Sequence, residues 1–399
     1  MRILLATDWN RGRGGAEAYA SLLREALEAA GDEVRLLTSS VGTAGDGGAD
    51  YVARGSERRA AQAFLQIANP FAVACARRAL RAFRPDVVWV NMFAHHLSPA
   101  LLHALGDVPF VLSVSDYKCI CPLGSKLLPD GSLCARRAGL VCSTSGCVGA
   151  LHWLRDRPRY ALLHAGVRRA ARVVACSAWV RDALAADGIP AEVIVLPVRA
   201  PEPGYERAPA ATPTLLYVGR LDREKGLPLL LRAFADVRLA EPASRLRIAG
   251  VGPERTLLDR LVAELALGDA VAFTGWCSPA GIERELSGAW ALVAPSLWAE
   301  PLGLVAPEAI VRGVPVIASA RGGFAETVVD GASGLLFENG DRAALAKHLL
   351  RIVRREVFPE HAVPPPLVAA AIARHEPHRH AAQLRTLFLA VQAKRARLR

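Results

Sequence analysis

The stretch PSLWAEPLGLVAPE at residues 295–308 decides the fold of this chain. It follows an apolar run, WALVA at residues 290–294, which is typical of a buried strand in a parallel sheet. Proline is tolerated in a helix only within its first turn, so Pro307 predicts a helix that begins near Leu304. A strand, a turn and a helix in this order form the repeating unit of a doubly wound α/β domain.

Two carboxylates, Glu300 and Glu308, stand on either side of the turn in the spacing E-x7-E. The amides of Gly303 and Leu304, at the start of the expected helix, suit an anion such as a diphosphate. Two carboxylates beside an anion would repel it unless they bind hydroxyl groups, and a sugar nucleotide offers both a diphosphate and hydroxyls. The alternative is that the pair only caps the helix and fills its first turn.

Two cations follow an earlier apolar run, in the segment GRLDREKG at residues 219–226. Parallel strands end at one edge of a sheet, so we expect Arg220 and Lys225 to lie at the edge that carries Glu300. The alternative is an ordinary solvated surface. The second half of the chain alternates cleanly between strands and helices, with strands expected at residues 214–219, 245–250, 271–275, 291–296, 315–319 and 334–337.

The first half of the chain also begins as a doubly wound unit, with a strand at residues 2–6, a Gly-rich loop at 10–15 and a helix at 16–30. The loop reads G-x-GG and lacks the dinucleotide pattern G-x-G-x-x-G, so a nicotinamide cofactor is not favoured. Residues 42–55 are expected to form a loop. Further strands are expected at residues 34–39, 85–91, 110–115, 172–177 and 193–196.

Four motifs occur in a fixed order at expected strand ends: GR-x4-KG at residues 219–226, G-x-GPE at 250–254, the 295–308 block, and ARGGxxE at 320–326. Together they resemble the retaining glycosyltransferases of family 4. The resemblance covers nearly the whole chain and is strongest over residues 214–340. It implies a GT-B fold, in which two Rossmann-like, doubly wound parallel-sheet domains face each other across a cleft.

The resemblance further implies a retaining, metal-independent enzyme of polysaccharide or cell-envelope biosynthesis. It would move a sugar from a nucleoside-diphosphate sugar to a glycan or lipid-linked acceptor, and no cofactor is required. Arg220 and Lys225 would neutralise the leaving diphosphate, Glu300 would contact the hydroxyls of the sugar, and Glu308 would contact the ribose diol. Backbone contacts with the donor are implied for Gly14, Gly15, Gly219, Gly250, Gly303 and Leu304. No metal ligands are implied at the site.

On the acceptor side, family members commonly place a His-Asp pair after the strand at residues 110–115. Ser115-Asp116 stands there in this chain. Asp116 can still orient an acceptor hydroxyl, and His95 or His96 after the preceding strand can take the role of the histidine. The alternative is that both histidines are ordinary loop residues.

The expected domain organisation has four parts. Residues 1–199 form an acceptor-side Rossmann-like domain that includes a Cys-rich loop at 116–150. Residues 200–213, rich in proline and alanine, form a linker. Residues 214–375 form a nucleotide-sugar-binding Rossmann-like domain, and residues 376–399 form a helix that returns to the first domain.

Five of the eight cysteines fall within the loop, and three explanations remain open. A structural zinc or another thiolate-held centre would replace a missing core, but the spacing contains no C-x2-C pair. A disulfide and uncoordinated packed thiols are the other two. The cysteines are Cys119, Cys121, Cys134, Cys142 and Cys147.

Composition excludes some classes of partner. A chain of 399 residues with 52% hydrophobic residues and 22% charged residues is typical of a globular protein of two domains. Its apolar runs fall short of a membrane span, and the first ten residues resemble a strand more than a signal peptide, so a cytoplasmic location is expected. Net charge is +11, yet no aromatic-interleaved basic patch predicts nucleic-acid binding.

The positive charge still leaves anionic membranes as partners. Arg77, Arg81 and Arg84 recur at i, i+4 and i+7, so they share one face of an expected helix, with Arg78 beside them. This face either docks on anionic lipid or a phosphorylated acceptor, or is merely solvated. The inner face of the membrane is therefore one expected location.

Two functions of different class fit these patterns. The first is a sugar transferase, and the second is a donor-binding but catalytically silent partner subunit, suggested by Ser115-Asp116. Both would bind a nucleoside diphosphate, and only the first would consume a sugar nucleotide. An epimerase or a phosphorylase on the same fold is a third reading, but the lysine-bound cofactor motif of a phosphorylase is not evident.

Overall fold

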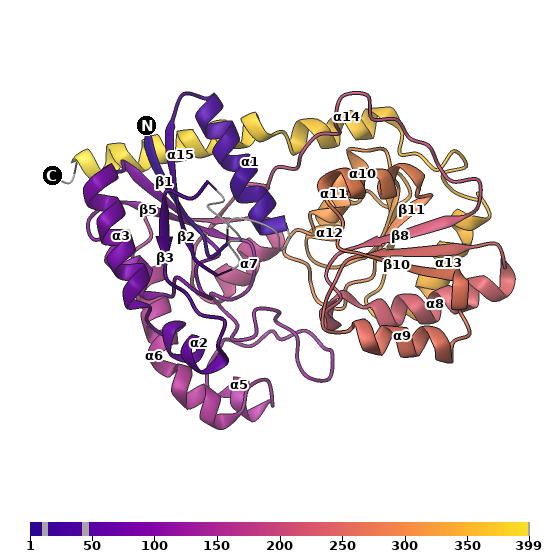
Figure 1. Ribbon diagram of the computed structural model, residues 1–399, viewed down its shortest axis with the longest axis horizontal. Coiled ribbons are helices and arrows are strands. Elements are labelled where there is room, and N and C mark those ends of the chain that lie inside the picture. The colour runs from indigo at the N-terminus through magenta and orange to yellow at the C-terminus, as the bar shows by residue number, and fades with distance from the viewer. Residues whose placement is uncertain (10–14, 42–47, 398–399) are drawn as a thin grey trace. The chain divides into compact units, whose positions relative to one another are not determined.

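The computed structural model describes residues 1–9, 15–41 and 48–397 and divides into two compact units. The N-terminal unit comprises Met1–Pro197 together with Pro377–Arg399, and the C-terminal unit comprises Val198–Glu376. Each unit carries one parallel sheet with helices on both of its faces (Figure 1).

The sheet of the N-terminal unit has the strand order β3-β2-β1-β4-β5-β6-β7, and every pairing is parallel. Strand order reverses direction between β1 and β4, and this switch point is where doubly wound sheets bind ligands, at the carboxyl ends of the strands. The strands are β1 (Arg2–Ala6), β2 (Glu33–Ser39), β3 (Tyr51–Ala53), β4 (Val87–Asn91), β5 (Phe110–Val114), β6 (Arg172–Ala175) and β7 (Glu192–Val193).

Two local expectations in this unit were wrong. The stretch expected to be a loop contains strand β3, which extends the sheet beside β2 because Val52 pairs with Thr38. The last strand comprises only Glu192–Val193, two residues, and does not run from 193 to 196.

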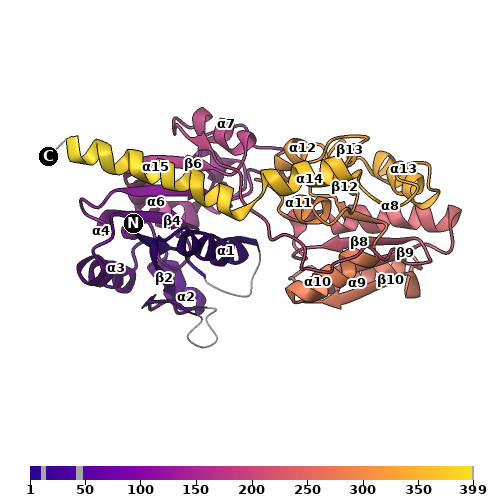
Figure 2. The same cartoon turned by 90° about the horizontal axis from the view of Figure 1, so that it is seen from above.

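Helix α3 begins at Pro70, where the Asn69 side chain accepts hydrogen bonds from the backbone N–H groups of Phe71 and Ala72 and so caps the helix. The terminal helix α15 lies beside α1, where the Tyr19 hydroxyl is 3.1 Å from Nε2 of His380 (Figure 2). The helices are α1 (Gly15–Ala29), α2 (Arg59–Leu65), α3 (Pro70–Phe83), α4 (Ala100–Ala104), α5 (Val141–Thr144), α6 (Ala150–Val167), α7 (Ala178–Ala186) and α15 (Pro377–Arg397).

The sheet of the C-terminal unit has the order β10-β9-β8-β11-β12-β13, again with parallel pairing throughout. All six strands expected from the sequence are present, and the inner strands β8, β11 and β12 are buried on both faces over nearly all of their length. Leu215, for example, packs with one core cluster and Leu216 with the other. The strands are β8 (Thr214–Val218), β9 (Arg245–Ala249), β10 (Val271–Gly275), β11 (Ala291–Ala294), β12 (Val316–Ser319) and β13 (Gly334–Phe337).

The helices of this unit cover the two faces of its sheet. On one face, Leu230 and Phe234 of α8 and Leu349 of α13 belong to the same buried cluster. On the other face, Ile310 of α11 packs with Phe324 of α12. The helices are α8 (Leu227–Ala240), α9 (Arg255–Glu264), α10 (Pro279–Gly288), α11 (Val305–Ile310), α12 (Gly323–Thr327), α13 (Arg342–Val353) and α14 (Pro365–Arg374).

The Cys-rich loop at residues 116–150 contains the short helix α5 and one antiparallel bridge between Leu127 and Leu133. All of its cysteines are free thiols, and Cys119 and Cys142 are buried. Within residues 1–9, 15–41 and 48–397, no group of three or more His, Cys, Asp or Glu side chains is arranged to hold a metal ion. The zinc hypothesis therefore gains no ligand set from this structure.

Across the same residues, none of the helices combines the length and the apolar character needed to cross a bilayer.

Candidate functional site

The loops that follow β8, β9, β11 and β12 meet at the carboxyl edge of the C-terminal sheet. Glycine residues allow the backbones of the first two loops to come into direct contact. Gly250, which follows β9, has φ 156°, and a Cβ atom placed there would lie 1.8 Å from the carbonyl oxygen of Gly219, which follows β8. No side chain fits in that space. The two glycines that the sequence assigned to donor contacts therefore fix the loops after β8 and β9 against each other.

The start of helix α11 is positioned in the same way. Gly303 has φ 75°, and a Cβ atom on it would lie 2.1 Å from the ring of Phe324 in α12. Leu304 is the N-cap residue of α11, and Pro307 lies in the first turn, as the sequence predicted. This close packing sets the direction of the short helix that carries Glu308.

Lys225 and Glu300 are brought together at this edge. Lys225 Nζ lies 2.6 Å from Oε1 of Glu300, although 75 residues separate them in the chain. The Ser296 hydroxyl donates to the same oxygen at 2.7 Å, and the Lys225 ammonium lies 5.1 Å from the ring centroid of Trp298. Glu300 is only 5% exposed, so its charge is balanced by Lys225 and Ser296 rather than by bulk water.

Arg220 lies on the same loop as Lys225 and is oriented by a buried partner. Its guanidinium forms an ion pair with Asp222, and its side chain remains 65% exposed. The Tyr217 hydroxyl donates to the Arg220 carbonyl at 2.7 Å. Burial, together with the charges of Glu300 and Asp222, raises the pKa of Tyr217 well above its usual value. Both carboxylates therefore lie near the Tyr217 hydroxyl at the end of β8.

Glu308 lies in the first turn of α11 and makes no hydrogen bond to Lys225 or Glu300 in the described part of the chain. Burial raises the pKa of Glu308 to about 7, and the positive charge of Arg312 opposes this rise. The ionisation of this carboxyl group is therefore shifted from the acidic range toward neutral pH. Either protonation state can hydrogen-bond hydroxyl groups, but the ionised form is the stronger acceptor.

A second constellation lies at the switch point of the N-terminal sheet and centres on Asp8, just beyond β1. Its carboxylate accepts hydrogen bonds from three consecutive backbone N–H groups, those of His95 at 2.7 Å, His96 at 2.8 Å and Leu97 at 2.7 Å. Asp8 is completely buried, and burial raises its pKa to about 7 against these bonds. Asp8 thus fixes the loop after β4.

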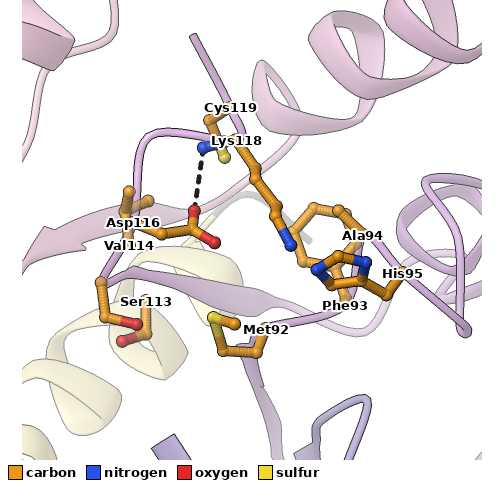
Figure 3. Close-up of a pocket in the computed structure, with 10 residues that line it drawn as sticks. Met92, Phe93, Ala94, His95, Ser113, Val114, Asp116, Lys118 and Cys119 are labelled. Carbon is orange, nitrogen blue, oxygen red and sulfur yellow. Dashed lines mark hydrogen bonds between the residues drawn. The ribbon is translucent and has the colours of Figure 1, made fainter. Parts of the chain in front are cut away.

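Next to it, residues at and beyond the ends of β4 and β5 line a small, partly open recess with a cavity volume of about 20 Å³ (Figure 3). His95, Asp116 and Lys118 are among its lining residues, and the Lys118 side chain extends toward the His95 ring. Oδ1 of Asp116 accepts a hydrogen bond from the Lys118 backbone N–H at 2.9 Å. Burial, together with the negative charge of Asp8, raises the pKa of Asp116 to about 6.

Of the acceptor-side candidates, Asp116 and His95 line this recess, whereas His96 is buried and is not among the lining residues. The rings of both histidines lie near Trp9, with centroids 4.9 Å from it for His95 and 5.6 Å for His96. Gly14 lies outside the described residues, and Gly15 is the first residue of α1.

Sequence reasoning missed several side chains that shape these sites. Asp8 directly follows the first strand as Ala-Thr-Asp, a signal that was available, because polar residues at parallel strand ends tend to reach the site. Asp222 lies inside the GR-x4-KG motif and could have been paired with Arg220 by its spacing. The contacts of Ser296 and Lys118 had no such signal, because they depend on how the loops fold.

Two family models match the chain. "Glycosyl transferase 4-like domain" matches residues 14–199, and "Glycosyl transferases group 1" matches residues 202–363. The chain belongs to the group 1 glycosyltransferases. The family that the sequence motifs indicated is thereby confirmed.

Curated relatives of this group 1 glycosyltransferase include two glycogen synthases. It is 40% identical to a glycogen synthase of Thermus thermophilus over 156 residues, which are 39% of this chain and 35% of the relative. It is 31% identical to that of Mycobacterium tuberculosis over 275 residues, 67% of this chain and 59% of the relative. The D-inositol 3-phosphate glycosyltransferase of Frankia alni is 39% identical over 154 residues, 35% of this chain and 37% of the relative. The chain thus matches between 35% and 59% of the length of these relatives.

Solved structures support the fold of this group 1 glycosyltransferase. Sucrose-phosphate synthase from Thermosynechococcus elongatus superposes with a TM-score of 0.75 at 24% identity, over 98% of this chain and 99% of that chain. Anabaena HepE in complex with UDP superposes with a TM-score of 0.70 at 19% identity, over 98% of this chain and all of that chain (100%). The two doubly wound parallel sheets are those of the GT-B fold, as predicted.

Proposed function

We propose that this group 1 glycosyltransferase moves a sugar from a nucleoside-diphosphate sugar to a glycan or lipid-linked acceptor, with retention and without a metal ion, in the synthesis of a cell-envelope or other polysaccharide. The observation that carries the proposal is the contact between Lys225 and Glu300, with Arg220 on the same loop. A cation and an acid in contact at a strand edge can bind the two ends of an activated sugar.

Cleavage of the bond between sugar and diphosphate leaves positive charge on the ring and negative charge on the leaving group. Arg220 and Lys225 neutralise the leaving group, which is the role a divalent metal ion plays in other transferases. Glu300 already accepts bonds from Lys225 and Ser296 at Oε1, so its second oxygen can receive a hydroxyl of the sugar. Glu308 accepts hydrogen bonds from the ribose diol.

The acceptor binds at the recess of the N-terminal unit, where Asp116 orients its hydroxyl and His95 or His96 stands in for the family histidine. Attack occurs on the face that the leaving group departs from, and a phosphate oxygen of the leaving group removes the proton of the acceptor. A UDP-sugar is the first donor to test, because the HepE structures contain UDP or UDP-glucose. We place the reaction at the cytoplasmic face of a membrane.

A panel of sugar nucleotides tests the proposal, scored by release of the nucleoside diphosphate with and without mixed glycan acceptors. Removal of one charge-stabilising contact costs about a hundredfold in rate, so Lys225→Ala and Glu300→Ala should each fall by about that factor. Arg260→Ala, an exposed change on α9, should leave the rate unchanged. An unaltered response to every donor in both site variants would refute this pocket.

The second candidate is a donor-binding but silent partner subunit, and one observation favours it: Ser115 stands where the family has histidine, with its hydroxyl directed at Oδ1 of Asn91 at 3.4 Å. Such a protein would bind the nucleoside diphosphate and depend on Lys225 for affinity. It would form no product with any acceptor.

A further inference from the structure

Arg312 is a buried cation that neither the sequence motifs nor the roles proposed above assign to the site. It lies four residues beyond Glu308, in the turn that ends α11, and its side chain is 8% exposed. Its guanidinium contacts one carboxylate oxygen of Glu283 in α10 twice, from Nη2 at 2.7 Å and from Nε at 3.0 Å.

The same groups also hold the beginning of the linker. Oε1 of Glu283 accepts a third hydrogen bond from the backbone N–H of Glu202 at 3.2 Å. Nη1 of Arg312 donates to the carbonyl oxygen of Glu308 at 3.0 Å and to that of Arg199 at 3.4 Å. One guanidinium therefore joins three segments of the C-terminal unit: the donor-site helix α11, helix α10 and the chain at residues 199–202.

The contacts of Arg312 do more than add an ion pair to the stability of the fold. A buried pair is weak evidence for stability, because desolvation offsets much of its attraction. Arg312, however, lies just after the end of α11, and its side chain folds back to donate a hydrogen bond from Nη1 to the backbone carbonyl of Glu308 in the first turn. Its charge also opposes the rise in the pKa of Glu308 that burial causes.

We propose that Arg312 is a positioning residue of the donor site: it fixes α11 against α10 and the linker, and it keeps the carboxylate of Glu308 able to accept hydrogen bonds from the ribose diol of the donor. The inference rests on the proposed function, because it takes the diol as the ligand of Glu308. Its consequence is a preference for ribonucleotides that depends on pH and on the charge at position 312.

Paired nucleotides separate this role from simple packing. The dissociation constants of UDP and of 2′,3′-dideoxy-UDP are measured by calorimetry at pH 6, 7 and 8, at constant ionic strength. Titration of the phosphates affects both probes alike, so their ratio reports on the diol. In the wild type this ratio should favour UDP and grow from pH 6 to pH 8 by up to about tenfold, because the stronger acceptor, the ionised form of a carboxyl of pKa about 7, becomes the major form.

Three variants complete the test. Arg312→Gln should reduce the preference for UDP at least fivefold at pH 7 and move its midpoint to higher pH, with the affinity for the dideoxy analogue changed less than twofold. Arg312→Lys keeps the charge and should keep most of the pH dependence. Glu283→Gln removes the partner of Arg312 but leaves the cation beside Glu308, so the midpoint should stay near that of the wild type.

Each contrary result has a definite meaning. Equal weakening of both nucleotides in Arg312→Gln, with an unchanged midpoint, would show that Arg312 only packs and would overturn the inference alone. A wild type that binds UDP but does not distinguish it from the dideoxy analogue would refute the diol contact of Glu308 and the inference with it. A wild type that binds no nucleoside diphosphate of any base would refute the proposed function itself.

Discussion

At the scale of single residues, Asp8 holds the N-terminal site together, because its fully buried carboxylate accepts hydrogen bonds from three consecutive backbone N–H groups. Asp8→Ala would leave those donors unpaired, two of them buried, and the loss of such a partner costs about 1–3 kcal/mol per group, not additively. We expect a loss of about 3 kcal/mol in the free energy of unfolding, measured by denaturant titration. Asp8→Asn retains one acceptor oxygen and should lose less. Equal stability of wild type and Asp8→Ala would contradict this role.

Asp116 is the residue whose charge should be visible in the activity. Its folded-state pKa of about 6 is raised by burial above the ordinary value of 3.8. The carboxylate that orients the acceptor hydroxyl is therefore lost as pH falls through 6, and turnover with acceptor should fall about tenfold from pH 7 to pH 5. Hydrolysis of the donor by water alone should lack this step. In Asp116→Asn the acidic limb should disappear, and its persistence would assign the limb to another group.

Single residues also show where prediction from the sequence stops. Arg220, Lys225 and Glu300 were chosen as candidate site residues because each lies in a motif at a strand end, and the contact between Lys225 and Glu300 follows from the order of β8 and β11. The partners of Asp8 lie about 88 residues along the chain, and those of Arg312 lie on two other segments. Such contacts depend on loop paths, which leave no periodic pattern in the sequence.

At the scale of elements, the short helix α11 depends on one glycine. A methyl group on Gly303 would meet the buried ring of Phe324, and φ 75° is unfavourable for any residue with a Cβ atom. Gly303→Ala should therefore lower the melting temperature and weaken UDP binding at least tenfold, since α11 and Glu308 must move. Gly288→Ala, at the end of α10, meets open space and is the matched control. Similar UDP affinities in the two variants would show that the position of α11 does not matter.

Buried strands were predicted more accurately than exposed edge strands, because burial leaves a clearer apolar pattern in the sequence. Strands β8, β11 and β12 of the C-terminal sheet are buried on both faces, so a nearly continuous apolar run marks each of them. Strand β3 has only three residues, Tyr-Val-Ala, at the edge of the sheet, and Val52 is 44% exposed. It follows a polar, Gly-rich stretch at residues 42–50, so the sequence alone placed it within a loop. A short edge strand that is stabilised mainly by pairing with its neighbour, as β3 is by β2, is difficult to predict from one sequence.

At the scale of the whole molecule, part of the net charge of +11 lies on the exposed side of α3, here called the basic arc, which carries Arg77, Arg78, Arg81 and Arg84. Helix α3 contains no acidic residue, its buried face consists of Ala72, Cys75, Ala76, Ala79 and Phe83, and Phe71 is 45% exposed at its start. No ion pair involves Arg77 or Arg81 within the part of the chain that the structure describes. A basic arc with an exposed aromatic side chain fits the surface of an anionic bilayer, where each arginine contributes about 1 kcal/mol.

Vesicle sedimentation tests this docking. The protein should bind phosphatidylcholine vesicles that contain phosphatidylglycerol and should bind vesicles of phosphatidylcholine alone much more weakly, with an affinity that falls as salt rises. Arg77→Glu with Arg81→Glu reverses two charges and should lower the partition coefficient at least tenfold. Arg260→Glu with Arg284→Glu changes the net charge equally on exposed helices of the C-terminal unit and is the matched control. If both double variants lose the same affinity, binding follows net charge alone, and the arc on α3 is only a solvated face.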